Sequence, residues 1–338
     1  MKAMVMRGFG PPEVMQLEDV PTPEPGPGEV LIEVHAVSVN RTLDLTVRAG
    51  QYPRPVRLPH VLGVDPSGVI VKLGPGVTSR RVGDRVATYL RLNPEDGKSA
   101  PELLGLTVWG GYAQYVKLPA ARTYLVPDGL DLDTATVVAR HAPLAFSMLR
   151  DKAKLVPREW VLVMGAAGGL GSSAVQTAKY LGARVIAGAG ADERVAAALR
   201  LGADFGVNYR AADLTAEVKR ITGGTGADIV LENIGDPDLF SRAFISLGRG
   251  GRLVTAGAHG GGIVPVNVSH LYINHLTIIG WTGQSDADVN DSLKAAAQGH
   301  LHVLIDRSLP LSAAAEAHRI VAARSGLGKV ILHPRSID

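Results

Sequence analysis

The sequence contains no cysteine, few aromatic residues and no long uncharged apolar run. Only 5% of its 338 residues are Phe, Trp or Tyr. Without cysteine there are no disulfides, thiol nucleophiles or thiolate-bound zinc or iron–sulfur sites, so a metal could use only His, Asp and Glu. The sequence contains no stretch of about 18 uncharged apolar residues, so no membrane span is predicted. The first residues lack the apolar core of a secretory signal. We therefore expect a cytoplasmic protein.

The charge is nearly balanced, with 35 basic and 32 acidic residues and a net charge of +3. Because these charges are dispersed, with no Lys/Arg-rich run, we expect no nucleic-acid partner and no membrane partner. The expected partner is a small molecule. Hydrophobic residues make up 46% and charged residues 20%, as in folded globular proteins, and the length predicts about two domains.

Three regions differ in texture. Residues 1–127 hold alternating runs such as 29–39 and 68–74 between Pro/Gly-rich turns, which predicts a β-rich barrel or sandwich. Residues 128–300 alternate apolar strands with amphipathic helices. This pattern predicts a parallel, doubly wound α/β sheet. Residues 301–338 predict a strand, a helix and a strand, which we expect to return to the first domain.

A glycine-rich turn follows the first strand of the second region. Gly165 lies at the end of a predicted strand at 160–166, and Gly168, Gly169 and Gly171 follow it before a predicted helix at 172–183. Glycines allow close backbone approach to a pyrophosphate, and a helix N-terminus offers N–H groups and a positive dipole end. The turn therefore predicts a dinucleotide site.

The next strand, at 184–190, indicates which dinucleotide binds. An NAD site usually has an acid near its end, which bonds the ribose 2′-hydroxyl. Ala189 stands where that acid is expected, and Arg194 follows on the next helix. The missing carboxylate and the guanidinium favour NADP(H), although Asp192 leaves NAD(H) open.

Seven segments, in this order, carry a family resemblance. The chain resembles the medium-chain dehydrogenase/reductase superfamily, most closely its zinc-free quinone oxidoreductase branch. This implies a GroES-like β-rich catalytic domain, a Rossmann NADP-binding domain, and a homodimer or homotetramer in which strand 276–280 pairs across the dimer axis. The segments are GPPEVMQLEDVPTPEPGPGEVLIEV, GVIVKLGPGVTSRRVGDRV, WGGYAQYVKLPA, GAAGGLGSSAVQTAKYLGARVIA, ITGGTGADIVLENIG, GGRLVTAGA and AAEAHRIVAARSGLGKVIL.

The resemblance also implies cofactor contacts at matching positions. The pyrophosphate turn would be Gly168, Gly169 and Leu170, and the 2′-phosphate contacts would be Arg194 and Tyr209. The loop along the adenosine half would be Asn233 and Ile234. The backbone at the nicotinamide end would be Ala256, Gly257, Ala258, Trp281 and Thr282, and Lys329 near the C-terminus is a further contact.

The zinc ligands of related alcohol dehydrogenases are missing. The matching positions hold Asn40, Val64, Asp65 and about Arg140, and the loop 91–102 replaces the four-cysteine zinc lobe. We therefore expect no metal. Without a Lewis acid, simple alcohols are poor substrates, whereas quinones and α,β-unsaturated carbonyls are already electrophilic. An NADPH-dependent quinone or enone reductase is favoured.

Four residues of the first domain are candidates for catalysis: Asn40, Arg48, Tyr52 and Asp65. The stretch 38–52 resembles the zinc-free family's V-N-P-x-D…R-x-G-x-Y pattern, with Arg41 in place of proline and one extra residue. Tyr52 could donate a proton or only pack at the rim.

Two other functions remain open. One is a zinc-free alcohol or aldehyde dehydrogenase in which His141 or Tyr52 replaces the metal. The other is a nucleotide-binding protein with little turnover. Arg140 and His141 would either give the pocket an unusual lining or form a surface pair at the domain hinge.

Overall fold

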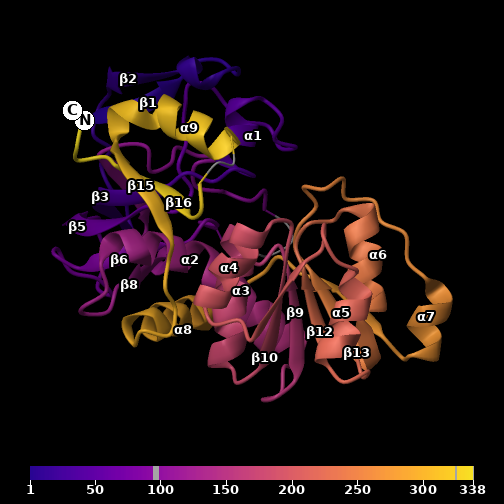
Figure 1. The fold of residues 1–338 in the computed structure, drawn as a ribbon. Helices are drawn as coiled ribbons and strands as arrows, with labels where there is room; N and C mark the ends of the chain where they lie inside the picture. The colour runs from indigo at the N-terminus through magenta and orange to yellow at the C-terminus, as the bar shows by residue number, and fades with distance from the viewer. Residues whose placement is uncertain (94–98, 324–325, 338) are drawn as a thin grey trace. The chain divides into compact units, whose positions relative to one another are not determined.

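The computed structural model describes residues 1–93, 99–323 and 326–337. Residues 94–98 of the predicted surface loop 91–102 lie outside these ranges. The chain forms two compact units, one of Met1–Arg140 with Val303–Asp338 and one of His141–His302 (Figure 1).

The boundary between the units falls inside helix α2 (Leu132–Phe146), not after residue 127 as predicted. The start of α2 is bonded to strands of the first unit. Ser67 Oγ donates to Leu132 O at 2.7 Å, and Thr136 Oγ1 donates to Ala36 O at 3.2 Å. Because these bonds join α2 to the β-rich part, the first unit continues into the helix.

The first unit is a GroES-like β-rich domain with two sheets. Three strands are ordered β2-β1-β4, and seven belong to a sheet ordered β15-β16-β3-β5-β6-β8, with β7 also paired to β3. Its elements are β1 Lys2–Met6, β2 Met15–Asp19, β3 Glu29–Ser38, α1 Asp44–Arg48, β4 His60–Val61, β5 Ser67–Leu73, β6 Arg85–Thr88, β7 Tyr115–Pro119, β8 Thr123–Leu125, β15 Ile305–Pro310, α9 Ala314–Ala323 and β16 Lys329–His333.

The C-terminal segment is part of the core of the first unit. β16 runs antiparallel to β3, with Ile331 opposite Ser38. Leu311, Ala314 and Leu332 are buried in the same cluster as the residues of β3 and β5. The pairing brings the start of β16 to the end of β3, where the candidate catalytic residues lie.

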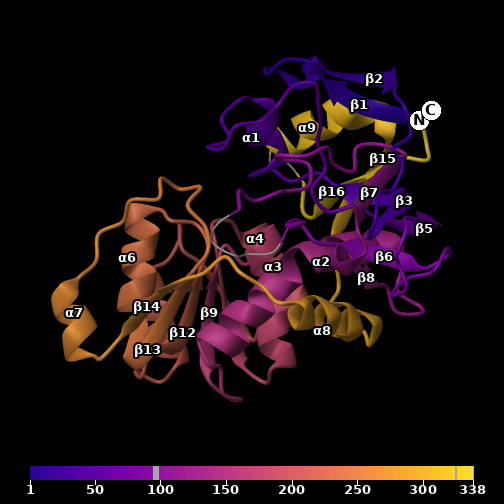
Figure 2. The same cartoon turned by 180° about the vertical axis from the view of Figure 1, so that it is seen from behind.

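The second unit is a Rossmann domain. Its six strands are parallel and follow the order β11-β10-β9-β12-β13-β14. Successive strands are added on one side of β9 up to β11 and then on its other side from β12, so the switch in strand order lies at β9. Figure 1 shows α5 and α6 in front of the strands, and Figure 2 shows α3 in front from the opposite side. Its elements are the π-helix Ser147–Lys152, β9 Trp160–Met164, α3 Gly169–Tyr180, β10 Arg184–Ala189, α4 Asp192–Arg200, β11 Phe205–Asn208, α5 Leu214–Ile221, β12 Ala227–Glu232, α6 Pro237–Ile245, β13 Leu247–Thr255, α7 Val268–Ile273, β14 Thr277–Gly280 and α8 Asp286–Ala297.

The sequence explains these strands and helix ends. Residues 161–164 of β9 are fully buried, as expected for a parallel strand covered on both faces. Asp213 and Asp236 cap α5 and α6 by accepting backbone N–H bonds, and Pro237 occupies the first turn of α6. No helix in the described ranges is long and apolar enough to cross a bilayer.

Candidate cofactor-binding and active site

The glycine-rich turn forms the N-terminus of α3. The helix begins at Gly169, earlier than the predicted residue 172, with Gly168 as its N-cap and no side chain capping it. Gly165 has a positive φ of 62°, and a Cβ on Gly171 would lie 2.1 Å from Gly165 O. Only glycine fits this close approach, which leaves backbone N–H groups at the turn to bind an anion. Gly168, Gly169 and Leu170 lie at this end of the helix.

Asn233 closes the turn from the neighbouring strand. Its Nδ2 donates to Met164 O at 3.0 Å, and a Cβ on Gly165 would lie 2.9 Å from Asn233 Oδ1. Asn233 follows β12 directly, so the ends of β9 and β12 meet here. This crevice at the switch in strand order is where open α/β sheets bind ligands.

The end of β10 is surrounded by cations. Ala189 is the last residue of the strand, and a Cβ on the following Gly190 would lie 3.1 Å from Tyr209 Oη and 3.3 Å from Arg210 Nε. Arg242 Nη1 donates to Tyr209 O at 3.1 Å. Burial raises the pKa of the Tyr209 hydroxyl, while Arg210 and Arg194 act in the opposite direction.

Asp192, the acid that left NAD(H) open, is already engaged. Its Oδ1 accepts a bond from Asn208 Nδ2 at 2.7 Å. Arg210 was not predicted from the sequence. The only signal for it was its place directly after Tyr209, at the end of β11.

The remaining predicted cofactor residues lie at the ends of β12, β13 and β14. A Cβ on Gly257 would lie 2.0 Å from Asn233 O, and one on Gly235 would lie 2.9 Å from Ala258 Cα. These close approaches bring the Asn233–Ile234 segment against Ala256, Gly257 and Ala258.

The buried carboxylate of Glu232 holds this loop, and sequence reasoning missed it. It accepts bonds from Ile234 N at 2.7 Å and from Thr255 Oγ1 at 3.0 Å. Trp281 N donates to Thr255 O, and its Nε1 donates to Ser147 Oγ at 2.9 Å; Thr282 follows it. The predicted cofactor residues of the second unit are thus gathered at the carboxyl ends of its strands.

The first unit contains a buried polar cluster just beyond β3. Asp65 Oδ2 accepts a bond from Ser38 Oγ at 2.5 Å and one from Asn40 Nδ2 at 3.0 Å. Lys329 Nζ donates to Asn40 Oδ1 at 2.8 Å. Lys329, expected at the cofactor, therefore belongs to the first unit and contacts a candidate catalytic residue.

Asp44 extends this cluster and was missed in the sequence as a site residue. Its carboxylate accepts bonds from Asn40 N at 2.7 Å and Gly63 N at 3.1 Å. Burial raises the pKa of Asp44 to about 7, and the nearby Asp65 charge adds to this shift. Burial also lowers the pKa of Lys329 to about 8, although Asp65 opposes that change.

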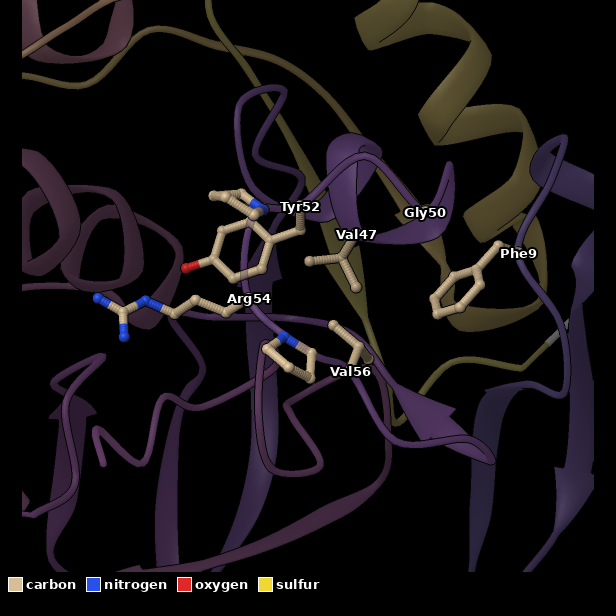
Figure 3. Close-up of a pocket in the computed structure, with 8 residues that line it drawn as sticks. Phe9, Val47, Gly50, Tyr52, Arg54 and Val56 are labelled. Atoms are coloured by element: carbon tan, nitrogen blue, oxygen red, sulfur yellow. The ribbon is translucent and has the colours of Figure 1, made fainter. Parts of the chain in front are cut away.

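The other two predicted catalytic residues lie beside different groups. Arg48 lies at the end of α1, and its positive charge acts to lower the pKa values of Tyr112 and His318. Tyr112 Oη and His318 Nε2 are 3.2 Å apart. Burial lowers the pKa of His318 to about 3, so its imidazole is neutral near pH 7. Tyr52 lines a cavity of about 350 Å³ (Figure 3).

The positions that match zinc ligands do not form a metal site. Within residues 1–93, 99–323 and 326–337, no group of three or more His, Asp or Glu side chains could hold a metal ion. Asn40 and Asp65 bond each other, and Lys329 bonds Asn40. The charge of Arg140 also acts on Lys329. A lysine ammonium bonded to Asn40 and close enough to Asp65 to feel its charge does not fit beside a divalent cation.

Both parts of the chain match known protein families, and known enzymes resemble it over nearly its whole length. Residues 26–128 match the alcohol dehydrogenase GroES-like domain family, and residues 169–298 match the zinc-binding dehydrogenase family. A 2-haloacrylate reductase from a Burkholderia species is 32% identical over 99% of this chain and 99% of its own length. The human quinone oxidoreductase is 32% identical over 98% of this chain and 97% of its own.

A solved structure agrees. The crystal structure of an NAD-dependent alcohol dehydrogenase has a TM-score of 0.88 and 37% identity, covering 98% of this chain and 99% of that chain. This likeness over nearly the whole length matches the two folds described above. The chain belongs to the medium-chain dehydrogenase/reductase superfamily, and within it is quinone oxidoreductase-like.

Proposed function

We propose that this protein is a zinc-independent, NADPH-dependent reductase of quinones or α,β-unsaturated carbonyls. The observation that carries the proposal is the Asn40–Asp65–Lys329 cluster. The Lys329 ammonium lies 2.8 Å from Oδ1 of Asn40, which occupies a position that the resemblance matches to a zinc ligand. The names of the quinone oxidoreductase and 2-haloacrylate reductase relatives agree with this chemistry.

The preference for NADPH rests on charge at the end of β10. The position of the usual acid is Ala189, and Arg210 lies against Gly190. Arg194 and Arg242 add positive charge around Tyr209. A 2′-phosphate would accept charge-assisted hydrogen bonds from such guanidinium groups, whereas a 2′-hydroxyl would gain little from them.

Reduction of an enone or quinone needs hydrogen-bond donors for the carbonyl oxygen more than it needs a metal. When bound, a nicotinamide would supply the hydride that adds to the β-carbon, and one proton from the protein or solvent would complete the reduction. Negative charge develops on the carbonyl oxygen, so fixed donors that face it lower the barrier. Lys329, with its pKa lowered to about 8, can hold a proton near neutral pH and release it more readily than an ordinary lysine. Asn40 orients the ammonium group.

A zinc-free alcohol or aldehyde dehydrogenase is the second candidate. The solved relative named as an NAD-dependent alcohol dehydrogenase favours it. So does the buried Asp44 carboxyl, whose pKa near 7 would suit a general base. This candidate requires protein donors to replace the metal's polarisation of a carbonyl, which is worth several kcal/mol.

The test is oxidation of NADPH and of NADH by the purified protein with quinones, enones and simple aldehydes, with and without a chelator. We expect chelator-resistant turnover of a quinone or enone, faster with NADPH. Turnover of aldehydes alone would favour the second candidate, and loss of activity with chelator would disprove zinc independence. Tight NADPH binding without any turnover would indicate the low-turnover nucleotide-binding protein.

A further inference from the structure

The first unit contains a cavity with apolar walls and one polar end. It measures about 350 Å³ and is lined by Phe9, Val47, Gly50, Tyr52, Pro53, Arg54, Pro55 and Val56. In Figure 3, the Tyr52 hydroxyl and the Arg54 guanidinium point to the same side, away from Phe9. Both groups are donors at neutral pH, because the arginine is charged and burial raises the pKa of the tyrosine.

A second guanidinium, that of Arg140, is not part of the cavity lining, but its charge acts on Tyr52. Arg140 is close enough to Tyr52 and to Lys329 for its charge to act on the titration of both. Its Nε is buried and has no hydrogen-bond partner in the described part of the first unit. Buried donors without partners are uncommon in folded proteins, and they are frequent where a ligand completes the site.

The carboxylates nearby are already engaged. Asp65 accepts bonds from Ser38 and Asn40, and Asp44 accepts backbone bonds from Asn40 and Gly63. None of the ion pairs between described residues of the first unit includes Arg54 or Arg140. Arg54 is exposed and Arg140 is partly buried. Two other partly buried arginines of the chain are paired, Arg150 with Asp288 and Arg252 with Glu159.

We propose that the substrate carries a carboxylate, which Arg54 and Arg140 bind beside Tyr52 while its hydrocarbon part contacts Phe9, Val47 and Val56. This inference rests on the proposed function, because it gives the substrate class of that reductase as an anionic enone. The planar fork of a guanidinium matches a carboxylate with two parallel bonds, which fixes both the position and the orientation of the ligand. The apolar walls would bind the hydrocarbon part by burying it.

The test compares one enone in two forms. One carries a terminal carboxylate separated from the conjugated system by two methylene groups, and the other is its methyl ester, so that electrophilicity is matched. The readout is the ratio of kcat/KM for acid over ester in the unaltered protein and in Arg54→Gln, Arg140→Gln and Arg57→Gln. Arg57 is exposed and does not line the cavity, so its variant is the matched control.

We expect the unaltered protein to prefer the acid. Arg54→Gln and Arg140→Gln should each lower the ratio about tenfold to a hundredfold, and Arg57→Gln should leave it unchanged. Equal use of acid and ester, or a ratio unaffected by both variants, would overturn the carboxylate site while leaving the reductase proposal intact. A greater preference for the phosphate ester of the same chain would overturn the choice of carboxylate.

A binding measurement separates this inference from the proposed function. Calorimetric titration of the full chain with the saturated acid requires no turnover. Binding that is lost in Arg54→Gln and Arg140→Gln, and kept in Arg57→Gln, supports the site even if no enone is reduced. Absence of binding to the unaltered protein overturns it. Arg54→Lys and Arg140→Lys retain the charge and guard against misfolding; their affinity should fall between those of the unaltered protein and the Gln variants.

Discussion

The proposed preference for NADPH rests on the charged groups at the end of β10. Asp192 Oδ1 already accepts a bond from Asn208, so one of its two carboxylate oxygens is occupied. Arg210 lies against Gly190, where a Cβ would make a tight contact of 3.3 Å with its Nε. The local excess of positive charge therefore results from removing an acid at Ala189 and from placing arginines around Tyr209.

We predict that Arg210→Gln weakens use of NADPH more than use of NADH. Losing a charge-assisted bond of about 1.5–3 kcal/mol should lower kcat/KM for NADPH by about tenfold to a hundredfold, since only NADPH carries the 2′-phosphate. Steady-state kinetics with both cofactors measures the change. Arg200→Gln, an exposed position on α4, is the control. Equal losses for both cofactors would contradict a role in phosphate binding.

We predict that deprotonation of Lys329 causes kcat to fall at alkaline pH. Because its pKa is lowered to about 8 from the usual 10.5, the ammonium form that can donate a proton is lost as pH rises through about 8. The kcat of the unaltered protein should fall over that range.

In Lys329→Met, kcat should be about a hundredfold lower at pH 7 and no longer show this limit. The pH profile of kcat measures both effects. Lys219→Met, an exposed position on α5, should keep the normal profile. An unchanged profile in Lys329→Met would assign the proton to another group.

Some site residues could be predicted from the sequence, and others could not. The turn at Gly168 and the missing acid at Ala189 could be predicted, because each follows from strand–turn–helix order. The bond between Lys329 and Asn40 could not, because the residues are far apart in sequence and meet only through the pairing of β16 with β3. Glu232 was missed for a similar reason, since its buried oxygens are satisfied by a loop whose shape the sequence does not reveal.

At the scale of elements, the alternation of strands and helices predicted the second unit well, but element ends were less certain. α3 begins at Gly169 because the glycine turn forms its first turn instead of preceding it. The unit boundary lies in α2 because side-chain bonds from Ser67 and Thr136 join that helix to the first unit. Hydrophobic periodicity does not reveal such bonds.

The edge strand β14 leads to a prediction about assembly. It pairs only with β13 among the described strands, and Ile278 on it is exposed, as are Tyr272 and Ile273 of α7. An unpaired edge with apolar side chains is prone to pair with another chain. We propose that two copies associate through β14.

Ile278→Lys should shift the protein toward monomers, since a charge on this edge opposes pairing. Sedimentation measures the oligomeric state. Val82→Lys, another exposed apolar position but in the first unit, is the control. A monomeric unaltered protein, or a dimer that persists in the variant, would contradict pairing through β14.

At the scale of the whole molecule, the two units differ in how the chain builds them. The second unit is one continuous segment, whereas the first needs both ends of the chain. The C-terminal segment supplies Leu311, Ala314 and Leu332 to the core of the first unit, and Lys329 to its polar cluster. Burying a leucine side chain contributes about 1.5–3 kcal/mol, so losing the segment removes much of the stability of that unit.

A chain ending at His302 should therefore retain the Rossmann sheet and lose the order of residues 1–140. We expect it to bind NADPH, because the predicted cofactor residues other than Lys329 lie in the second unit, and to be inactive with every electrophile. Limited proteolysis reports cleavage within residues 1–140, and NADPH fluorescence reports binding. A chain ending at Arg335, which retains β16, should resist proteolysis like the full chain. If the shorter chain were equally resistant, the first unit would not depend on its C-terminal segment, and the buried contacts of β16 and α9 would contribute little to its folding.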